Sequence, residues 1–600
     1  MTISGELLRY DLRKETYEFI NWMEEDRQRD RVSLRRMIGG IGFAFDEFLS
    51  AKPCRDPSAK FVINTGFLTG LPRHGVPNGC TRTYVTFHSP VKEKNGSYGI
   101  AYAAAGGLCG PHIKSCGVDA VILVGKANRP VGVMLDASSD EREVCLIDMD
   151  PWVTTKETVD MCFKLGYRGS VVVGPAGFRG VRFASAHVSY MPHDHVRAAA
   201  RGGPGLALAG MNVKAVGFNG GKDRTPSPRN WTPEVEKWMR SINLELASGS
   251  GTEKYKQHGT WGGNWSYLVP LKALPAENFG NLDPKDAYKL DPEYLKSQGW
   301  SVSQKGCACP IMCWKIPKDP SGRSLWKIDY ENIDLLGPNC GIYDIYTVSQ
   351  AIEMCDMQGI DAMSTGGVIA WFFEHNKRLG KGPTFGDGQA LLDLIQKIAE
   401  KRDEGGILAE GVKKASEIMG DADIAMHVKG LEGAAYPFWS NLGYAFALRG
   451  ACHTSLGTYT IGLANPSGVS NPRWWSDEIV KAIPPSMICQ MSGACYFTRK
   501  VIIPELPRLV KNLIGVEATR EEIERSAMQT YVIARMIDCK NGFSSADDSL
   551  PERAFRNTTT KELLAETKLL FYEKMGFDRN GTVTEETLQK HGLENLSAYI

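Results

Sequence analysis

Short apolar runs dominate the first third of the chain and predict β-strands. Each run spans four to six residues, either alternating in polarity or continuously apolar, and is bounded by Gly, Pro or Asp. Few helical periods separate the runs, so residues 1–218 are expected to form a mostly antiparallel sheet domain. The predicted strands are residues 7–12, 60–64, 83–87, 120–125, 131–135, 170–173 and 213–217.

The pattern becomes helical after residues 219–231, a stretch rich in Gly, Pro and charged residues that is typical of a linker. Beyond it, apolar residues recur at helical spacing, and a further domain boundary is expected near residues 403–425. The predicted helices are residues 233–246, 346–358, 388–401, 519–537 and 584–591. The sequence therefore predicts an α+β protein, with a β-rich domain at 1–218 and two mainly α-helical domains at 219–415 and 416–600.

Composition is that of a globular protein and excludes several classes. The chain is 42% hydrophobic and 23% charged, and its net charge of +1 lacks the basic excess of a nucleic-acid-binding protein. The N-terminus has no signal-peptide pattern, and no run approaches the ~20 apolar residues that span a bilayer. The 15 cysteines follow no disulfide-scaffold spacing, so reduced thiols and metal ligands are expected. These features predict a cytoplasmic enzyme.

Three thiols lie within seven residues in the stretch 306–313 (GCACPIMC), at Cys307, Cys309 and Cys313. Disulfide geometry disfavours pairing among cysteines this close. Three soft ligands at one point indicate zinc or an iron–sulfur cluster, and either metal needs a fourth ligand. The alternative is three reduced cysteines that pack as small hydrophobic residues.

Two kinds of motif suggest a ligand other than a metal. Glycine-rich stretches at 103–110 (AAAGGLCG) and 201–205 (RGGPG) let the backbone approach a bulky anion, although both also suit tight turns. The stretches 356–361 (DMQGID) and 490–495 (QMSGAC) share one form, in which a glycine precedes an apolar residue and then a polar or metal-binding one. The second stretch ends in Cys495, a candidate for the missing fourth ligand, and such loops at helix ends also suit a polar heterocycle.

Many further stretches give the chain a family resemblance over essentially its whole length. The chain resembles the tungsten-containing aldehyde:ferredoxin oxidoreductases through stretches that occur in order along the sequence. The matching stretches are 7–12 (LLRYDL), 39–42 (GGIG), 105–111 (AGGLCGP), 181–184 (VRFA), 201–203 (RGG), 274–279 (LPAENF), 336–342 (LGPNCGI), 359–366 (GIDAMSTG), 449–453 (RGACH), 542–543 (GF) and 547–553 (DDSLPER).

The resemblance implies a β-sheet base below two helical domains, with cofactors bound at their interface. One tungsten, or molybdenum in its place, would be held by the dithiolenes of two pterins, with Mg²⁺ bridging the pterin phosphates and one [4Fe–4S] cluster nearby. Cys309, Cys313 and Cys495 match the family's cluster ligands, whereas Cys307 falls one residue late in the motif and Cys489 is a nearby reserve thiol.

The resemblance also assigns pterin-binding positions to this chain. Asp356 and Asp361 fit the family's first pterin loop, while Gln490 and Gly493 belong to the second, where Gln490 stands in place of the usual Asp. Ala104 stands where the family has asparagine, so a magnesium bridge there would use backbone oxygen. The positions that face pterin and phosphate are Arg82, Gly106 and Arg182.

For the chemistry, Glu331 and His453 resemble the family's active-site pair. Without the resemblance, a lone Glu would be interpreted as a solvated surface charge, and a lone His as a side chain whose hydrogen bonds are satisfied within the protein. The resemblance implies that Glu331 is the general base for water attack on an aldehyde and that His453 donates a hydrogen bond to the carbonyl oxygen. Electrons would pass through the cluster to ferredoxin, and the product would be a carboxylate.

Three other functions stay open. The first is the catalytic subunit of a benzoyl-CoA-reductase-like complex or a family member with another substrate, because residues 434–439 (AAYPFW) depart from the family's usual pocket wall. The second is a non-catalytic iron–sulfur electron-transfer subunit, and the third is a zinc protein. The expected partners are a small-molecule substrate and ferredoxin or an iron–sulfur subunit, in a homodimer or a hetero-oligomer.

Overall fold

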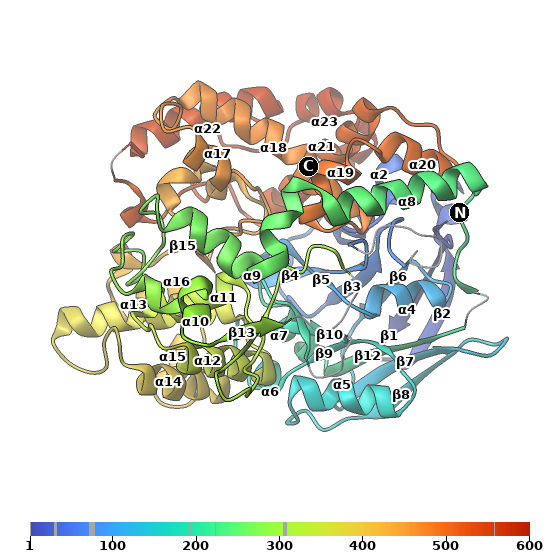
Figure 1. The fold of residues 1–600 in the computed structure, drawn as a ribbon. Coiled ribbons are helices and arrows are strands. Elements are labelled where there is room, and N and C mark those ends of the chain that lie inside the picture. The colour runs from blue at the N-terminus through green and yellow to red at the C-terminus, as the bar shows by residue number, and fades with distance from the viewer. Residues whose placement is uncertain are drawn as a thin grey trace.

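Two six-stranded sheets form the N-terminal part of the computed structural model, and helices pack around them (Figure 1). The structure describes residues 2–28, 33–70, 79–190, 195–221, 224–303, 309–556 and 558–600. In Figure 1 the sheets lie at the centre and lower right, the helices of residues 330–420 at the left, and the C-terminal helices across the top. The predicted α+β class, with strands first and helices later, is confirmed.

The two sheets repeat one topology. In each sheet the first strand pairs in parallel with the sixth, and every other pairing is antiparallel. The first sheet has the order β2-β1-β6-β3-β4-β5, with β1 (Glu6–Asp11), β2 (Thr16–Asn21), β3 (Lys60–Thr65), β4 (Arg82–Lys94), β5 (Ser97–Gly106) and β6 (Ala120–Val124). The second has the order β8-β7-β12-β9-β10-β11, with β7 (Val131–Ala137), β8 (Glu143–Asp148), β9 (Gly169–Val173), β10 (Ala186–Val188), β11 (Arg197–Ala199) and β12 (Val213–Gly220). Helices α4 (Cys109–Ser115) and α7 (Pro204–Gly210) precede the sixth strand of their sheets.

Burial on two faces explains why the strands read as continuous apolar runs. In β3, Phe61 and Ile63 pack into a core shared by both sheets, whereas Val62 packs into the larger core under the helices. A strand covered on both faces has no solvent side that would require alternation. All seven predicted strands are present, within one to two residues at most ends, and β4 extends seven residues further.

The five predicted helices are also present. They are α8 (Pro233–Ser248), α12 (Ile345–Gln358), α14 (Gly388–Glu400), α21 (Arg520–Lys540) and α23 (Glu585–His591). The other long helices are α9 (Ser250–Leu268), α13 (Ala362–Leu379), α18 (Pro472–Ser492) and α22 (Lys561–Met575). The shorter elements are α1 (Trp22–Gln28), α2 (Leu34–Ile38), α3 (Ile41–Ala44), α5 (Thr155–Lys164), α6 (Pro175–Phe178), α10 (Pro292–Ser297), α11 (Tyr330–Leu336), α15 (Gly405–Leu408), α16 (Val412–Met419), α17 (Tyr459–Ala464), α19 (Arg499–Ile502), α20 (Leu506–Ile514), β13 (Ser301–Ser303), β14 (Ile316–Lys318), β15 (His427–Val428) and β16 (Leu431–Glu432).

The two stretches of similar sequence, 356–361 and 490–495, have the same local structure. Each closes a long helix with a left-handed glycine, Gly359 (φ 75°) after α12 and Gly493 (φ 95°) after α18. Each loop also packs on a glycine that follows the third strand of one sheet. A Cβ atom on Gly66 would lie 2.1 Å from the Ser492 carbonyl carbon, and one on Gly174 would lie 2.2 Å from the Gln358 oxygen. The helical part thus contacts equivalent points of the two sheet repeats.

No helix among the described residues is long and apolar enough to cross a membrane. The boundaries at 218/219 and 415/416 stay predictions. The C-terminal helices α18 and α21 pack against α2 and α3 near the N-terminus, so distant parts of the chain share one core.

Candidate active site

A central cavity of about 260 Å³ lies where the ends of β5 and β11 meet α9, α11 and the loops after α12 and α18. It collects charged side chains, tyrosines and thiols that are distant in sequence. The predicted site residues that line it are Arg82, Ala104, Cys313, Glu331, Asp356, Asp361, His453 and Cys495.

The remaining predicted residues lie elsewhere. Gly106 pairs with Arg82 in the β4–β5 ladder. Gln490 lies in the last turn of α18 and Gly493 directly follows this helix, and neither lines the central cavity. Cys309 is half-buried near Cys313 but also does not line the cavity. Cys307 is outside the described residues.

Arg182 is not brought to the central cavity either. Its Nε donates to the Pro90 carbonyl at 3.1 Å, and its guanidinium lies 3.8 Å from Glu93 and 3.7 Å from Glu410. These contacts occupy the side chain outside the set of cavity-lining residues.

Glu331 and His453 face each other in the central cavity. Glu331 lies in the first turn of α11, where its Oε2 accepts the Ala435 N–H at 2.8 Å. Its Oε1 lies 3.0 Å from His453 Nδ1, but the two atoms are not aligned for a hydrogen bond. Both atoms are buried and lack a hydrogen-bond partner among the described residues. Because buried polar atoms are almost always paired, this pair indicates a ligand or water in the cavity.

Burial keeps this pair uncharged near neutral pH. It raises the pKa of Glu331 to about 8. Burial, followed by the charges of Arg201 and Arg449, lowers the pKa of His453 to about 3. Desolvation disfavours the charged form of each group. A carboxyl with a pKa near the working pH is suited to exchange protons with a substrate.

Three tyrosines wall the cavity around this pair. Tyr436 stacks on Tyr459 with ring centroids 3.9 Å apart, and its ring lies 5.7 Å from that of His453. Tyr330 donates to the Ala435 carbonyl at 2.6 Å. Tyr436 comes from the AAYPFW stretch, so the departure from the family sequence lies at the pocket wall.

Five cations line the central cavity, and two of them have no acidic partner. Arg197 pairs with Asp329 at 3.1 Å, Arg201 pairs with Asp361 at 2.9 Å, and Lys327 contacts Asp356. In contrast, no carboxylate of the described residues lies within 4.0 Å of Arg82 or Arg449.

The two arginines without a carboxylate partner donate hydrogen bonds to carbonyl, hydroxyl and thiol groups of the described residues. Arg82 donates to the Ala104 carbonyl at 3.2 Å and to Cys495 Sγ at 3.3 Å. Arg449 donates to the Tyr102 carbonyl at 2.8 Å and to Thr454 Oγ1 at 2.6 Å. Burying a cation without a counter-charge is costly. The cavity therefore fits an anionic ligand, such as a phosphate-bearing pterin.

Both loop carboxylates have partners inside the protein. Asp356 accepts from Trp326 Nε1 at 2.7 Å; although burial opposes it, Lys327 and His187 hold the pKa of Asp356 well below its usual range. Asp361 caps α13 by accepting the Met363 N–H at 3.1 Å. These bonds fix the loop that faces the cavity.

Cys313 and Cys495 approach the cavity from the two helical regions. The Cys495 N–H donates to the Gly79 carbonyl at 2.9 Å, and the Cys313 carbonyl accepts the Thr260 N–H at 2.7 Å. Burial raises the pKa of Cys313 to about 12, and Arg197 opposes this shift. Within the described ranges, no three His, Cys, Asp or Glu side chains are grouped for one metal ion.

Sequence reasoning missed Arg197, Lys327 and Arg449 as cavity residues. Part of the cavity lining did leave a signal in the sequence: residues 103–107 (AAAGG) and 198–203 (AAARGG) are similar, lie at the ends of the fifth strands of the two sheets, and each contribute residues to the cavity. This echo marks the repeat that the apolar pattern alone does not show.

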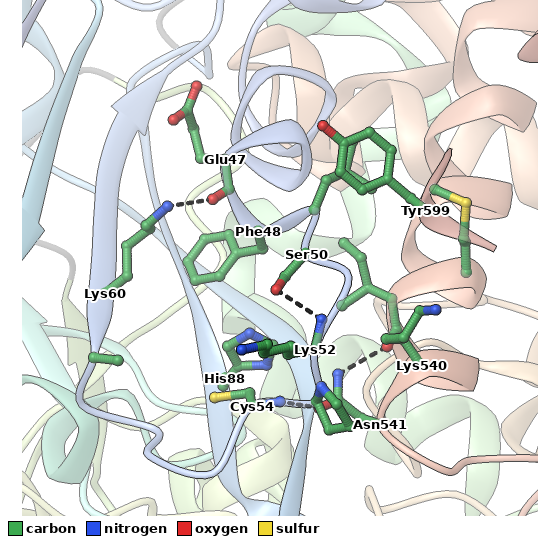
Figure 2. A pocket seen from close by; sticks show the side chains of 15 residues that line it. Glu47, Phe48, Ser50, Lys52, Cys54, Lys60, His88, Lys540, Asn541 and Tyr599 are labelled. Atoms are coloured by element: carbon green, nitrogen blue, oxygen red, sulfur yellow. Dashed lines mark hydrogen bonds between the residues drawn. The ribbon is translucent and has the colours of Figure 1, made fainter. Parts of the chain in front are cut away.

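A second cavity, of about 330 Å³, lies between the first sheet and α21 (Figure 2). Two of its polar groups have protein partners: Lys60 Nζ donates to the Glu47 carbonyl at 2.5 Å, and the Cys54 N–H donates to Asn541 Oδ1 at 2.7 Å. Burial lowers the pKa of His88 to about 4. This second cavity is lined by none of the predicted site residues.

Comparison with known proteins places the chain in a family of oxidoreductases. Residues 8–220 match the aldehyde ferredoxin oxidoreductase N-terminal domain, and residues 237–593 match domains 2 and 3 of the same enzymes. These matches span most of the chain, which therefore belongs to the aldehyde ferredoxin oxidoreductase family. It is an enzyme of this family of tungsten oxidoreductases.

Individual relatives differ in what they act on. The chain is 28% identical to the tungsten-containing aldehyde ferredoxin oxidoreductase of Pyrococcus furiosus, over 94% of this chain and 96% of the relative. It is 24% identical to the aliphatic sulfonate oxidoreductase WOR-like subunit of the same organism, over 98% and 97%. Among solved structures, the active-site complex BamBC of benzoyl coenzyme A reductase matches with a TM-score of 0.79 at 18% identity, over 99% and 98% of the two chains. This last likeness shows the fold alone.

Proposed function

We propose that the chain oxidises an aldehyde to a carboxylate and passes the electrons through a [4Fe–4S] cluster to ferredoxin. The observation that supports this most is the Glu331–His453 pair, which shares one cavity with Cys313 and Cys495. A carboxyl that can exchange a proton, a neutral histidine and two thiols thus lie around the space that also fits an anionic cofactor.

The residues of the central cavity suit a tungsten–bispterin group. Arg82, Arg197, Arg201 and Arg449 would bind its phosphates, and the Ala104 carbonyl would face a bridging Mg²⁺. The loops of Asp356 and Asp361 and of Gln490 and Gly493 would hold the two pterins at equivalent positions of the two sheet repeats. When bound, this group accepts two electrons from the substrate, and molybdenum could take the place of tungsten.

In the reaction, RCHO and H₂O give RCOO⁻, three protons and two electrons. The ionised form of Glu331 takes a proton from the water whose oxygen bonds to the carbonyl carbon. The neutral His453 ring donates its N–H to the carbonyl oxygen, where negative charge develops. The Tyr436–Tyr459 wall limits bulk water, which strengthens both interactions.

Cys309, Cys313, Cys495 and Cys307 are the proposed cluster ligands. Cys307→Ser should lower the iron content of purified protein, measured by mass spectrometry. Cys489→Ser is the matched control, because Cys489 is buried in α18 and is the reserve thiol. If only the Cys489 variant loses iron, Cys489 is the cluster ligand and Cys307 is the reserve thiol.

The second candidate is a benzoyl-CoA-reductase-like catalytic subunit, which the fold shared with BamBC over nearly the whole chain also allows. Such an enzyme consumes electrons and works with partner subunits. A non-catalytic iron–sulfur subunit or a zinc protein would not need the Glu331–His453 pair. A homodimer or a hetero-oligomer stays a prediction.

A parallel assay separates the two candidates. The purified holoenzyme is given a panel of aldehydes with an oxidised viologen, and separately benzoyl-CoA with a reduced viologen. Aldehyde-dependent dye reduction, with no benzoyl-CoA reduction, supports the proposal. Turnover of benzoyl-CoA alone would overturn it.

A further inference from the structure

Three cationic side chains gather on the surface beside Cys495. Lys254 in α9 and Lys500 in α19 are exposed, and Arg499 at the start of α19 is half-buried. None has a carboxylate within 4.0 Å among the described residues. Partial desolvation by neighbouring groups, although the side chain is exposed, and then the charges of Lys500 and Arg499 lower the pKa of Lys254, which places the three cations near one another. We call Lys254, Arg499 and Lys500 the cationic patch.

Aromatic rings connect the cationic patch to the cavity. Lys254 Nζ lies 4.9 Å from the centre of the Tyr255 ring, which packs 4.9 Å from that of Phe497. The Arg499 guanidinium lies 4.0 Å from the centre of the Tyr496 ring. These three aromatic residues line the central cavity together with Cys313 and Cys495. Lys254 and Arg499 therefore contact rings that line the cavity with the two thiols.

We propose that the cationic patch is the docking surface for an acidic iron–sulfur protein that accepts electrons from this enzyme. The inference rests on the proposed function and adds the place where the electrons leave. Each aldehyde oxidised releases two electrons, so two oxidised one-electron carriers are reduced per turnover. Unpaired cations beside the exit attract an acidic carrier and orient its cluster toward Cys495.

The charge of the cationic patch argues against a second copy of this chain as the occupant. A two-fold symmetric contact would place the patch against itself, bringing like charges together. The whole chain has a net charge of only +1, so the attraction is local rather than a general property of the protein.

The test is the double variant Lys254→Glu with Lys500→Glu in the holoenzyme. Both side chains are exposed, so the variant should fold. With one aldehyde, the KM for an acidic ferredoxin should rise at least about tenfold, and its dependence on salt should flatten. Turnover with benzyl viologen, a small dye that needs no docking, should stay within about twofold of the unmodified enzyme.

The matched control is Lys126→Glu with Lys381→Glu, which changes the net charge equally at two exposed lysines outside the patch. This control should leave the ferredoxin KM unchanged. An unchanged KM in the patch variant, or an equal loss with ferredoxin and dye, would overturn the proposal.

Binding without turnover keeps the result independent of the substrate. Oxidised ferredoxin should bind the unmodified protein by calorimetry at low salt and bind the patch variant at least about tenfold more weakly. If vesicles containing phosphatidylglycerol bind the patch and ferredoxin does not, the surface docks a membrane and the inference fails. Absence of aldehyde–dye activity in the unmodified enzyme would instead contradict the proposed function.

Discussion

Two buried clusters of charge in this protein differ in how their charges are paired. In the paired network, Lys429 and Arg535 each lie 2.9 Å from Asp548, and Lys92 contacts Asp538. In the central cavity, Arg82 and Arg449 have no carboxylate partner among the described residues, and Glu331 is protonated near neutral pH. The side chains of the paired network are almost fully buried, whereas Arg82 and Glu331 in the cavity are half-buried.

The comparison shows what each cluster does. The paired network uses its charges within the protein: Lys429 also donates to the Ala445 and Ala447 carbonyls at 2.8 and 3.1 Å, and Lys92 donates to the Leu448 carbonyl. These carbonyls lie directly before the stretch 449–453 that carries His453. The network thus fixes the segment that presents the active-site pair, whereas the cavity leaves cations and polar atoms for a ligand.

The largest expected effect is on turnover, in the unpaired cluster. Glu331→Gln removes the proposed base while preserving the size of the side chain, and should lower kcat about 10²–10⁴-fold. Tungsten and iron content should not change. Glu353→Gln, outside the cavity, is the control and should turn over normally. Full activity of the Glu331 variant would refute its role.

In the paired network, the expected effect is on folding. Asp548→Asn leaves Lys429 and Arg535 without their carboxylate, which should lower the free energy of unfolding by about 3–5 kcal/mol. Asp423→Asn removes an exposed partner of Arg378 and should cost at most about 1 kcal/mol. Denaturant titration of the apoproteins measures both values. Equal losses would mean that the two networks do not differ as described.

The pH dependence of activity should report Glu331. Its base form is ionised above a pKa of about 8, so kcat/KM should rise about tenfold per pH unit below pH 8 and level off above it. His453, with a pKa of about 3, stays neutral throughout this range. A flat profile between pH 5 and 8 would contradict the assignment.

The same shift has a signed effect on apoprotein stability. The folded-state pKa of Glu331 is raised above its usual value of 4.5, so the folded state binds more protons between pH 4.5 and 8. The contribution of Glu331 to stability is therefore fully present below pH 4.5 and is lost as pH rises toward 8. The difference in unfolding free energy between the unmodified protein and the Gln variant should change in this direction.

The smallest expected effect is on the stability of the apoprotein when an unpaired cation is removed. Arg82→Gln should change it by less than about 1 kcal/mol, because the lost hydrogen bonds offset the relief of desolvation. The same variant should retain less tungsten after gel filtration, since a phosphate-binding donor is gone. Normal tungsten retention would argue against a cofactor role for Arg82.

The sequence predicted most of the sheet and the long amphipathic helices, because burial leaves a periodic pattern. It missed α13 because this helix is buried on nearly every side and shows no polar face. It missed α18 because Pro484 and Pro485, inside the helix, normally argue against one. Both failures arise where tertiary packing outweighs local preference.

The active-site residues were predicted only in part, because their grouping depends on contacts between residues that are distant in sequence. Glu331, His453, Asp356, Asp361 and Cys495 come together as the family resemblance implied. Arg182 does not join them, because Pro90, Glu93 and Glu410 hold its side chain elsewhere. The sequence carries no local pattern for such long-range partners, and the role of each residue stays a proposal.

The most direct test of the account is the metal and pterin content of the purified protein. Elemental mass spectrometry with pterin extraction should find one tungsten or molybdenum, two pterins and about four irons per chain, the iron of one [4Fe–4S] cluster. Zinc alone, with no pterin, would contradict the central claim that this cavity holds a pterin-bound metal beside an iron–sulfur cluster.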